Sequence, residues 1–125
     1  MSTIVISNIK ATGETASRAV SGVAAAWVNF DGTGTIAVRD SQGVSGLVDD
    51  GAGNYRVNLT NAMGNANYSY VGSAGYNTAG SNDVNFTASN GSANMGASVF
   101  GVRVDISATN TDVPLVCASA HGDLA

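Results

Sequence analysis

The sequence predicts an all-β protein, an antiparallel β-sandwich of jelly-roll-like type with an N-terminal attachment strand, assembled as a trimer. Glycine, alanine, serine, asparagine and threonine supply 72 of the 125 residues. Leucine, glutamate, lysine, glutamine and arginine together number only eleven, which is too few for a helical fold. From residue 27 onward, apolar residues alternate with polar ones in short runs between Gly/Asn/Ser-rich turns, as half-buried strands do.

Composition and charge exclude several classes of protein. Only 11% of residues are charged, and the net charge of −4 comes with five scattered basic residues, so no patch suits nucleic acid or an anionic membrane. No apolar run approaches the 18 residues of a bilayer span, and the first residues lack a signal-peptide pattern. The single cysteine, Cys117, cannot form an intrachain disulfide, and no cofactor is expected.

The chain divides near residue 26 into an attachment segment, 1–26, and a sandwich domain, 27–125. The attachment segment opens with a β-rich run, residues 3–9, and continues as a small, polar linker. Residues 17–26 could form a helical turn, although Gly22 disfavours it. An apolar strand of this kind can add to a neighbouring sheet. Its candidate partner-contacting residues are Ile4, Ile6 and Ile9.

Two hairpins follow, each with glycine in the turn, where positive φ is needed. The first joins residues 28–30 to 35–39 through the turn 31–34, and the second joins 44–49 to 55–60 through 50–54. Further strands are expected at 67–72, 83–87, 98–107 and 113–120, with loops at 73–82 and 88–96 and a turn at 109–112. Seven to nine short strands at this spacing indicate a sandwich or a barrel.

The predicted core is slight. The sequence has three phenylalanines, four tyrosines and one tryptophan, and many strand positions hold alanine, serine or asparagine, which bury little apolar area. A domain of this size buries roughly two-thirds of its unfolded surface, so small side chains leave a thin margin. We therefore expect an obligate oligomer, a trimer, in which subunits share the burial.

The sequence offers few residues for catalysis or metal binding. His121 is the only histidine, and Cys117, four residues earlier on the same strand face, lies about 13 Å away along the strand, too far for a hydrogen bond. Three copies of His121 around a trimer axis could hold a metal, but a structural or exposed histidine is the prediction. We therefore assign no catalytic, cofactor-binding or metal-ligating residue.

Acidic and glycine-rich segments resemble two further kinds of site. Residues 49–54 (DDGAGN) carry oxygen ligands but lack the spacing and terminal glutamate of a calcium loop, so a hairpin turn is favoured. Asp49 and Asp83 could form a glycosidase pair, although nothing in the sequence fixes their separation. No phosphate-binding fingerprint occurs.

Tyrosine in Gly/Asn/Ser-rich sequence is typical of recognition loops. Tyr68 and Tyr70 are predicted to be core residues of one strand face, with recognition as the alternative, and Tyr76 is the candidate exposed residue. Asn90 and Asn94, in the loop at 88–96, complete the candidate partner-binding set.

Residues 26–41 (AWVNFDGTGTIAVRDS) resemble the AWVNFNGTGTVAIRDS block of tail-fibre-like virion proteins of marine and other bacteriophages. Residues 43–59 resemble that family's NVSSITDNGTGDYTVNF, residues 61–68 its AMPDANY, and the final HGDLA its usual terminus. The similarity covers roughly residues 26–72 and the tail, about half of the chain.

The resemblance implies a β-rich, trimeric, non-enzymatic structural protein of the virion, assembled in the host cytoplasm. Without a long shaft, a short tail fibre or receptor-binding tip is expected, contacting other virion proteins and a host surface glycan or protein. The alternatives are a capsid decoration protein and, from other classes, a carbohydrate-active subunit or a free carbohydrate-binding module.

Overall fold

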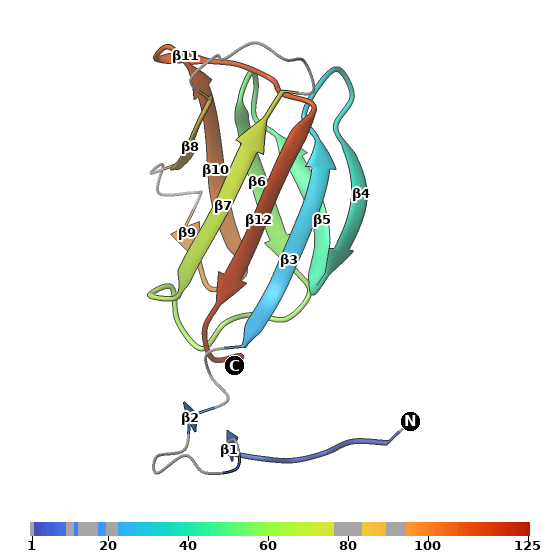
Figure 1. Ribbon diagram of the computed structural model, residues 1–125, viewed down its shortest axis with the longest axis vertical. Coiled ribbons are helices and arrows are strands. Elements are labelled where there is room, and N and C mark those ends of the chain that lie inside the picture. Colours follow the sequence, from blue (N-terminus) through green and yellow to red (C-terminus); the bar gives the residue numbers. More distant parts are fainter. Residues whose placement is uncertain (1, 10–11, 13–17, 20–22, 77–83, 90–94) are drawn as a thin grey trace.

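A computed structural model describes residues 2–9, 12, 18–19, 23–76, 84–89 and 95–125 of the chain. All regular structure in these residues is β-strand (Figure 1). The strands are β1 (Asn8–Ile9), β2 (Arg18–Ala19), β3 (Ala24–Asp31), β4 (Ala37–Gln42), β5 (Val44–Asp49), β6 (Asn54–Leu59), β7 (Ser69–Gly75), β8 (Val84–Ala88), β9 (Met95–Gly96), β10 (Val99–Ile106), β11 (Thr109–Asn110) and β12 (Leu115–His121). The predicted all-β class is confirmed.

Two antiparallel sheets face one another in a sandwich-like arrangement (Figure 1). The first sheet has the order β4-β3-β12-β7, and the second has the order β11-β10-β6-β5, with β8 and β9 also pairing with β10. Strand β12, near the C-terminus, pairs with β3 on one side and β7 on the other. The first and last long strands of the sandwich are therefore neighbours.

The core lies between the two sheets and draws on both. Phe30 of β3 and Tyr55 of β6 meet edge to face, with ring centroids 5.1 Å apart. Phe100 of β10 packs against Tyr70 of β7 at 4.8 Å. The other large, fully buried side chains are Met63 and six valines, Val28, Val57, Val102, Val104, Val113 and Val116. Valine is the commonest of the buried hydrophobic residues, and a few larger rings fill the space between them.

The first hairpin forms as predicted. β3 pairs with β4, and the register shifts between Asn29 and Phe30. In the turn, the Asp31 carboxylate accepts hydrogen bonds from the Thr33 amide (2.9 Å) and hydroxyl (2.6 Å), and Gly34 takes φ +61°. These bonds lower the pKa of Asp31 below its usual value, with a smaller contribution from Arg39.

The second hairpin, β5–β6, also matches its predicted bounds closely. Tyr55, Val57 and Leu59 face the core, as the alternation indicated. Its turn closes through the Asn54 amide donating to Gly51 O at 2.8 Å. Gly53, with φ +65°, leaves no room for a side chain, because a Cβ there would lie 2.2 Å from Val104 O.

Two boundaries differ from prediction. β7 runs Ser69–Gly75 rather than 67–72, so the first residues of the predicted loop at 73–82 belong to the strand. The turn after β10 is made by Ser107 and Ala108, both with positive φ, while the predicted turn residues Thr109 and Asn110 form β11. Serine and alanine rarely adopt this conformation, so residues 107 and 108 carry no recognisable turn signal.

The N-terminal arm, defined here as residues 2–9, departs most from expectation. Only Asn8–Ile9 form a strand, which pairs with Arg18–Ala19 rather than with either large sheet. Arg18–Ala19 is therefore extended, not part of a helical turn, and β3 begins at Ala24, three residues before the predicted division. Ile4, Val5 and Ile6 are 84%, 91% and 50% exposed. The arm thus presents three consecutive apolar side chains to solvent.

Candidate functional site

The predicted partner-contacting residues lie in separate parts of the chain. Ile4 and Ile6 are exposed on the arm, and Ile9 pairs with Arg18 in the β1–β2 hairpin. Tyr76, just after β7, is 43% exposed. Asn90 and Asn94 lie outside the described residues. The structure therefore groups the isoleucines together but not with Tyr76.

Tyr76 and β9 lie at opposite ends of the sandwich. Gly75 pairs with Leu115 at the start of β12, whereas β12 ends beside Ser69, where the arm joins. Tyr76 is therefore at the end remote from the arm. Met95–Gly96 pairs with Phe100 and Val99, at the arm end of β10 (Figure 1). The structure therefore does not bring Tyr76 together with Met95–Gly96, the described end of the predicted loop at 88–96.

Tyr68 and Tyr70 are core residues, as predicted. The Tyr68 hydroxyl lies 3.0 Å from Gly96 O and 2.8 Å from Val99 O, and the Tyr70 hydroxyl donates to Gly101 O at 2.9 Å. Burial raises the pKa of Tyr68 to about 12 and raises that of Tyr70 as well. The Tyr70 hydroxyl therefore links β7 to the opposite sheet, and the Tyr68 hydroxyl does the same from the segment just before β7.

The acidic segment at 49–54 is a hairpin turn rather than an open set of oxygen ligands. Asp49 accepts a hydrogen bond from the Gly51 amide at 2.9 Å. Asp50 accepts two from Arg56, at 2.6 and 2.7 Å, which raise the pKa of the guanidinium. Asp83, the predicted partner of Asp49, lies outside the described residues. Among the described residues, no group of three histidines, cysteines or acids is arranged to hold a metal.

Cys117, Ser119 and His121 form a row on the outer face of β12. Ser119 Oγ lies 3.1 Å from His121 Nε2, so a hydroxyl and an imidazole are within hydrogen-bond distance. No role for Ser119 was predicted from the sequence, although residues two apart on a strand share a face. Because β12 pairs with a strand on both sides, its backbone amides around Ser119 donate hydrogen bonds to β3 and β7 and do not form an oxyanion hole. The pair alone is therefore poorly built for acyl transfer.

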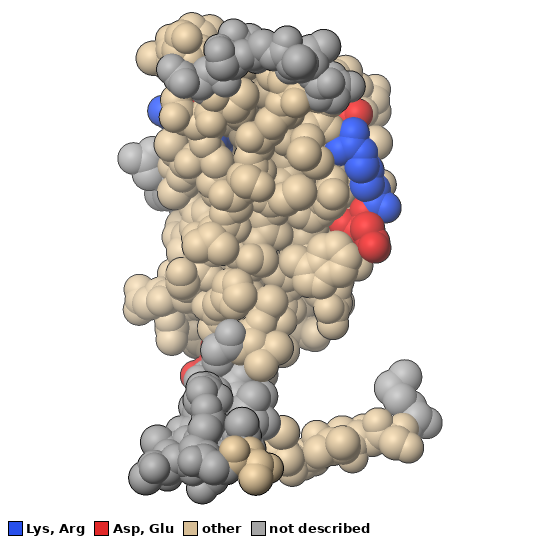
Figure 2. Space-filling view, in the orientation of Figure 1, with Lys and Arg blue, Asp and Glu red and all other residues tan. Residues whose placement is uncertain are grey.

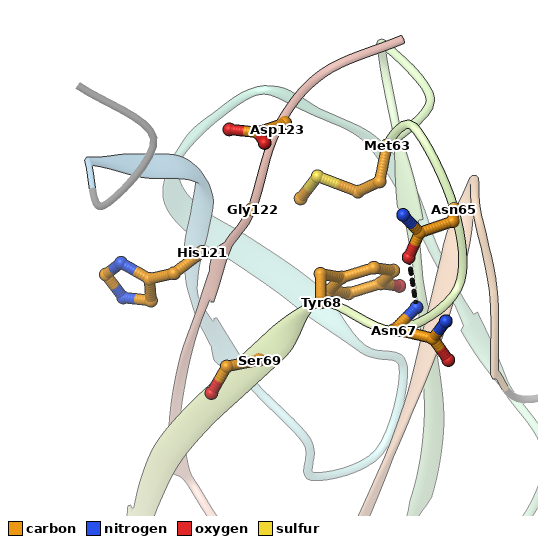
Figure 3. Close-up of a pocket in the computed structure, with 8 residues that line it drawn as sticks. All are labelled: Met63, Asn65, Asn67, Tyr68, Ser69, His121, Gly122 and Asp123. Carbon is orange, nitrogen blue, oxygen red and sulfur yellow. Dashed lines mark hydrogen bonds between the residues drawn. The ribbon is translucent and has the colours of Figure 1, made fainter. Parts of the chain in front are cut away.

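A cavity of about 300 Å³ lies at the arm end of the sandwich. Figure 3 shows its lining, in which Asn65 accepts a hydrogen bond from the Asn67 amide at 2.7 Å. The His121 side chain points away from Met63 and Asn65 in this view. The complete lining is Met63, Asn65, Asn67, Tyr68, Ser69, His121, Gly122 and Asp123. Its polar groups diverge rather than converging on one ligand.

A second and wider hollow, the outer-face groove, lies on the solvent side of β3, β12 and β7. It has a volume of about 470 Å³ and is lined by Trp27, Val28, Asn29, Val71, Gly72, Ser73, Cys117, Ala118 and Ser119. None of these residues carries a formal charge. Figure 2 shows this face, with charged atoms gathered along the β4 side, where Arg39 pairs with Asp31 at 3.0 Å.

The two outer faces of the sandwich differ in polarity. The second sheet carries charged pairs on its outer side, including Arg103 with the largely buried Asp105 at 3.3 Å and Arg56 with Asp50. The outer-face groove is uncharged and holds one buried acceptor, Asn29 Oδ1, for which the described residues offer no hydrogen-bond donor. The first sheet therefore presents the surface better suited to contact with another uncharged surface.

The part of the chain that the structure describes contains no helix long and apolar enough to cross a bilayer. Comparisons of the chain with protein-family models, with curated proteins and with solved structures find no match.

Proposed function

We propose that this chain is a non-enzymatic structural protein of a bacteriophage particle, a short tail fibre or receptor-binding tip that contacts the host surface. The observation that carries the proposal is the construction of the molecule. An exposed apolar arm precedes a sandwich whose first sheet carries an uncharged groove. Such a chain is built to be held by other proteins through its arm and one face.

The resemblance to phage tail-fibre-like proteins supports the same role. Its strongest blocks, residues 26–41 and 43–59, coincide with the β3–β4 and β5–β6 hairpins. The resemblance thus follows whole structural units rather than scattered positions. Tyr76, exposed at the end remote from the arm, is the described residue best placed to face a host receptor.

We also propose that the protein is a trimer and that its sandwich is of the jelly-roll-like type. Only three aromatic rings, those of Phe30, Tyr55 and Phe100, are fully buried. A core of this size gives a single chain limited stability, and subunit contacts would add burial. Light scattering after size-exclusion chromatography should give three times the chain mass at micromolar concentration, and a stable monomer would refute the trimer.

Host binding tests the receptor-binding role. Purified, fluorescently labelled protein should bind host cells and, when unlabelled, should compete with phage adsorption. The Tyr76→Ala variant, which removes a side chain that is 43% exposed, should bind and compete less well than the unsubstituted protein. Absence of both binding and competition by the unsubstituted protein would overturn the receptor-binding role.

A capsid decoration protein is the alternative within the same structural class, because a sandwich held by an arm and one face also suits a protein that joins neighbouring capsomers. Labelled protein found on the head rather than the tail would select this alternative. Release of reducing ends from host polysaccharide would instead revive a carbohydrate-active role.

A further inference from the structure

The outer-face groove has the shape of a trough along β12. Trp27 of β3 and Val71 of β7 both stand opposite Ser119, so two larger side chains flank a small one. One row further along, Cys117 stands between Asn29 of β3 and the small Ser73 of β7. Neighbouring strands are about 4.8 Å apart, so the walls of the trough are roughly 10 Å apart.

The repeat of the trough matches the repeat of an extended chain. Ser119 and Cys117 are two residues apart on β12, which places the two rows of the floor roughly 6.8 Å from one another. Ile4 and Ile6 are also two residues apart, and in an extended backbone their side chains point to one side with the same spacing. Two isoleucine side chains can therefore enter two successive small-residue positions.

The arm and the trough also match in polarity. Residues 2–9 contain no ionisable side chain, and Ile4, Val5 and Ile6 are exposed. Contiguous exposed apolar residues are typical of an interaction segment. The residues that line the outer-face groove likewise carry no formal charge.

The arm in the structure does not lie on the groove of its own chain. Among the described residues, the strand pairing of the arm is β1 with β2, and in Figure 1 the segment before β1 lies below the base of the sandwich. An arm that pairs with neither large sheet of its own chain can reach a second copy, as exchanged segments do.

We propose that the arm of one copy lies along β12 in the outer-face groove of a second copy, with Ile4 and Ile6 seated on the Ser119 and Cys117 rows. The contact joins two different surfaces, so each copy gives one arm and receives another. Contacts of this kind close into a ring when the rotation between copies allows it. This inference deepens the proposed function, since it names the contact that would hold the trimer together.

The native Cys117 allows a direct test, because it lines the groove and is the single cysteine of the chain. The Ile6→Cys variant is treated with diamide at micromolar concentration, and its products are separated on a non-reducing gel and mapped by peptide mass. We expect most of the protein to form a disulfide between position 6 of one chain and Cys117 of another. The Val38→Cys variant is the control, because Val38 is 47% exposed on β4 of the same sheet but outside the groove.

A link within one chain, or linking no faster than in the Val38→Cys control, would overturn the proposal. A second pair of variants needs no added cysteine. Val71→Glu places a charge on the groove wall and should dissociate the oligomer, while Val38→Glu should not. Circular dichroism checks that both fold, and an oligomer that is unchanged in a folded Val71→Glu variant would also overturn the contact.

The outcome is separable from the fate of the proposed function. If the chain is found on purified phage particles but no link between copies forms, the arm-to-groove contact fails and the virion role stands. If the link forms but the chain is absent from particles, the contact stands and the virion role fails.

Discussion

The hydroxyl of Tyr55 should stabilise the sandwich through bonds that its ring alone cannot make. Tyr55 is 1% exposed, and its hydroxyl lies 2.8 Å from Asp112 Oδ1 and 3.1 Å from Gly32 O. The same Asp112 oxygen accepts the Gly53 amide at 2.8 Å. One phenol therefore links β6 to the turn after β3 and to the segment before β12. Burial, followed by the bond to Asp112, raises the pKa of this phenol well above its usual range.

The Tyr55→Phe substitution removes these bonds and keeps the ring that packs on Phe30. A hydrogen bond to a charged acceptor contributes about 1.5–3 kcal/mol, so the free energy of unfolding should fall by about 2 kcal/mol. For a domain of this size, that corresponds to a fall in Tm of roughly 6–10 °C. Asp112 keeps its bond from the Gly53 amide, which argues against a larger loss.

Urea denaturation followed by circular dichroism measures the change, with all variants at one protein concentration because oligomerisation shifts apparent stability. Tyr76→Phe is the matched control, since that hydroxyl is at an exposed position, and it should lie within about 0.5 kcal/mol of the unsubstituted protein. A double-mutant cycle with Asp112→Asn should show coupling of about 0.5 kcal/mol or more. A Tyr55→Phe variant as stable as the Tyr76→Phe control would refute the reasoning.

Three further predictions follow from the described contacts. Gly72→Ala should destabilise the fold by about 1–3 kcal/mol, because the new Cβ would lie 2.4 Å from the Phe86 ring, whereas Gly46→Ala, with nothing within 4 Å, should cost little; equal urea midpoints would contradict this. Burial raises the pKa of Tyr68 to about 12, whereas the pKa of tyrosine in the unfolded chain is about 10. The stabilisation that the protonated phenol provides is therefore complete below pH 10 and is lost as the pH rises towards 12. Tyr68→Phe should therefore weaken the fall in stability between pH 10 and 12, and an unchanged slope in urea midpoints would count against it. Tyr76→Ala should reduce host-cell binding several-fold while leaving the melting temperature unchanged, and undiminished binding would remove Tyr76 from the receptor surface.

The local elements of the fold were largely readable from the sequence. Both early hairpins carry glycine in the turn, and one strand of each, β3 and β6, alternates between buried and partly exposed residues, so local preferences and burial agree there. The turn at Ser107 and Ala108 could not be predicted, because the two-residue loop between the paired Ile106 and Thr109 requires positive φ of residues that do not favour it. β7 begins at Ser69, two residues later than predicted, and Tyr68 just before it bonds through its hydroxyl to carbonyls at the end of the opposite sheet.

The candidate site was only partly readable. The apolar arm could be predicted from the sequence, because three consecutive apolar residues, Ile4 to Ile6, lie near its N-terminus. The outer-face groove was not, because it requires Trp27, Ser119 and Val71 to lie side by side, and these residues are far apart in the chain. Which residues become neighbours across a sheet depends on the order of the strands, and a local sequence pattern does not reveal that order.

The most direct test of the proposed role is the location of the chain on purified phage particles, determined by cryo-electron microscopy with labelled antibody against the protein. The account predicts density for the sandwich at the tail, repeated about a three-fold axis, with the arm ends towards the particle and Tyr76 outward. Density on the head would replace the tail role by decoration, and absence of the chain from intact particles would contradict the central claim.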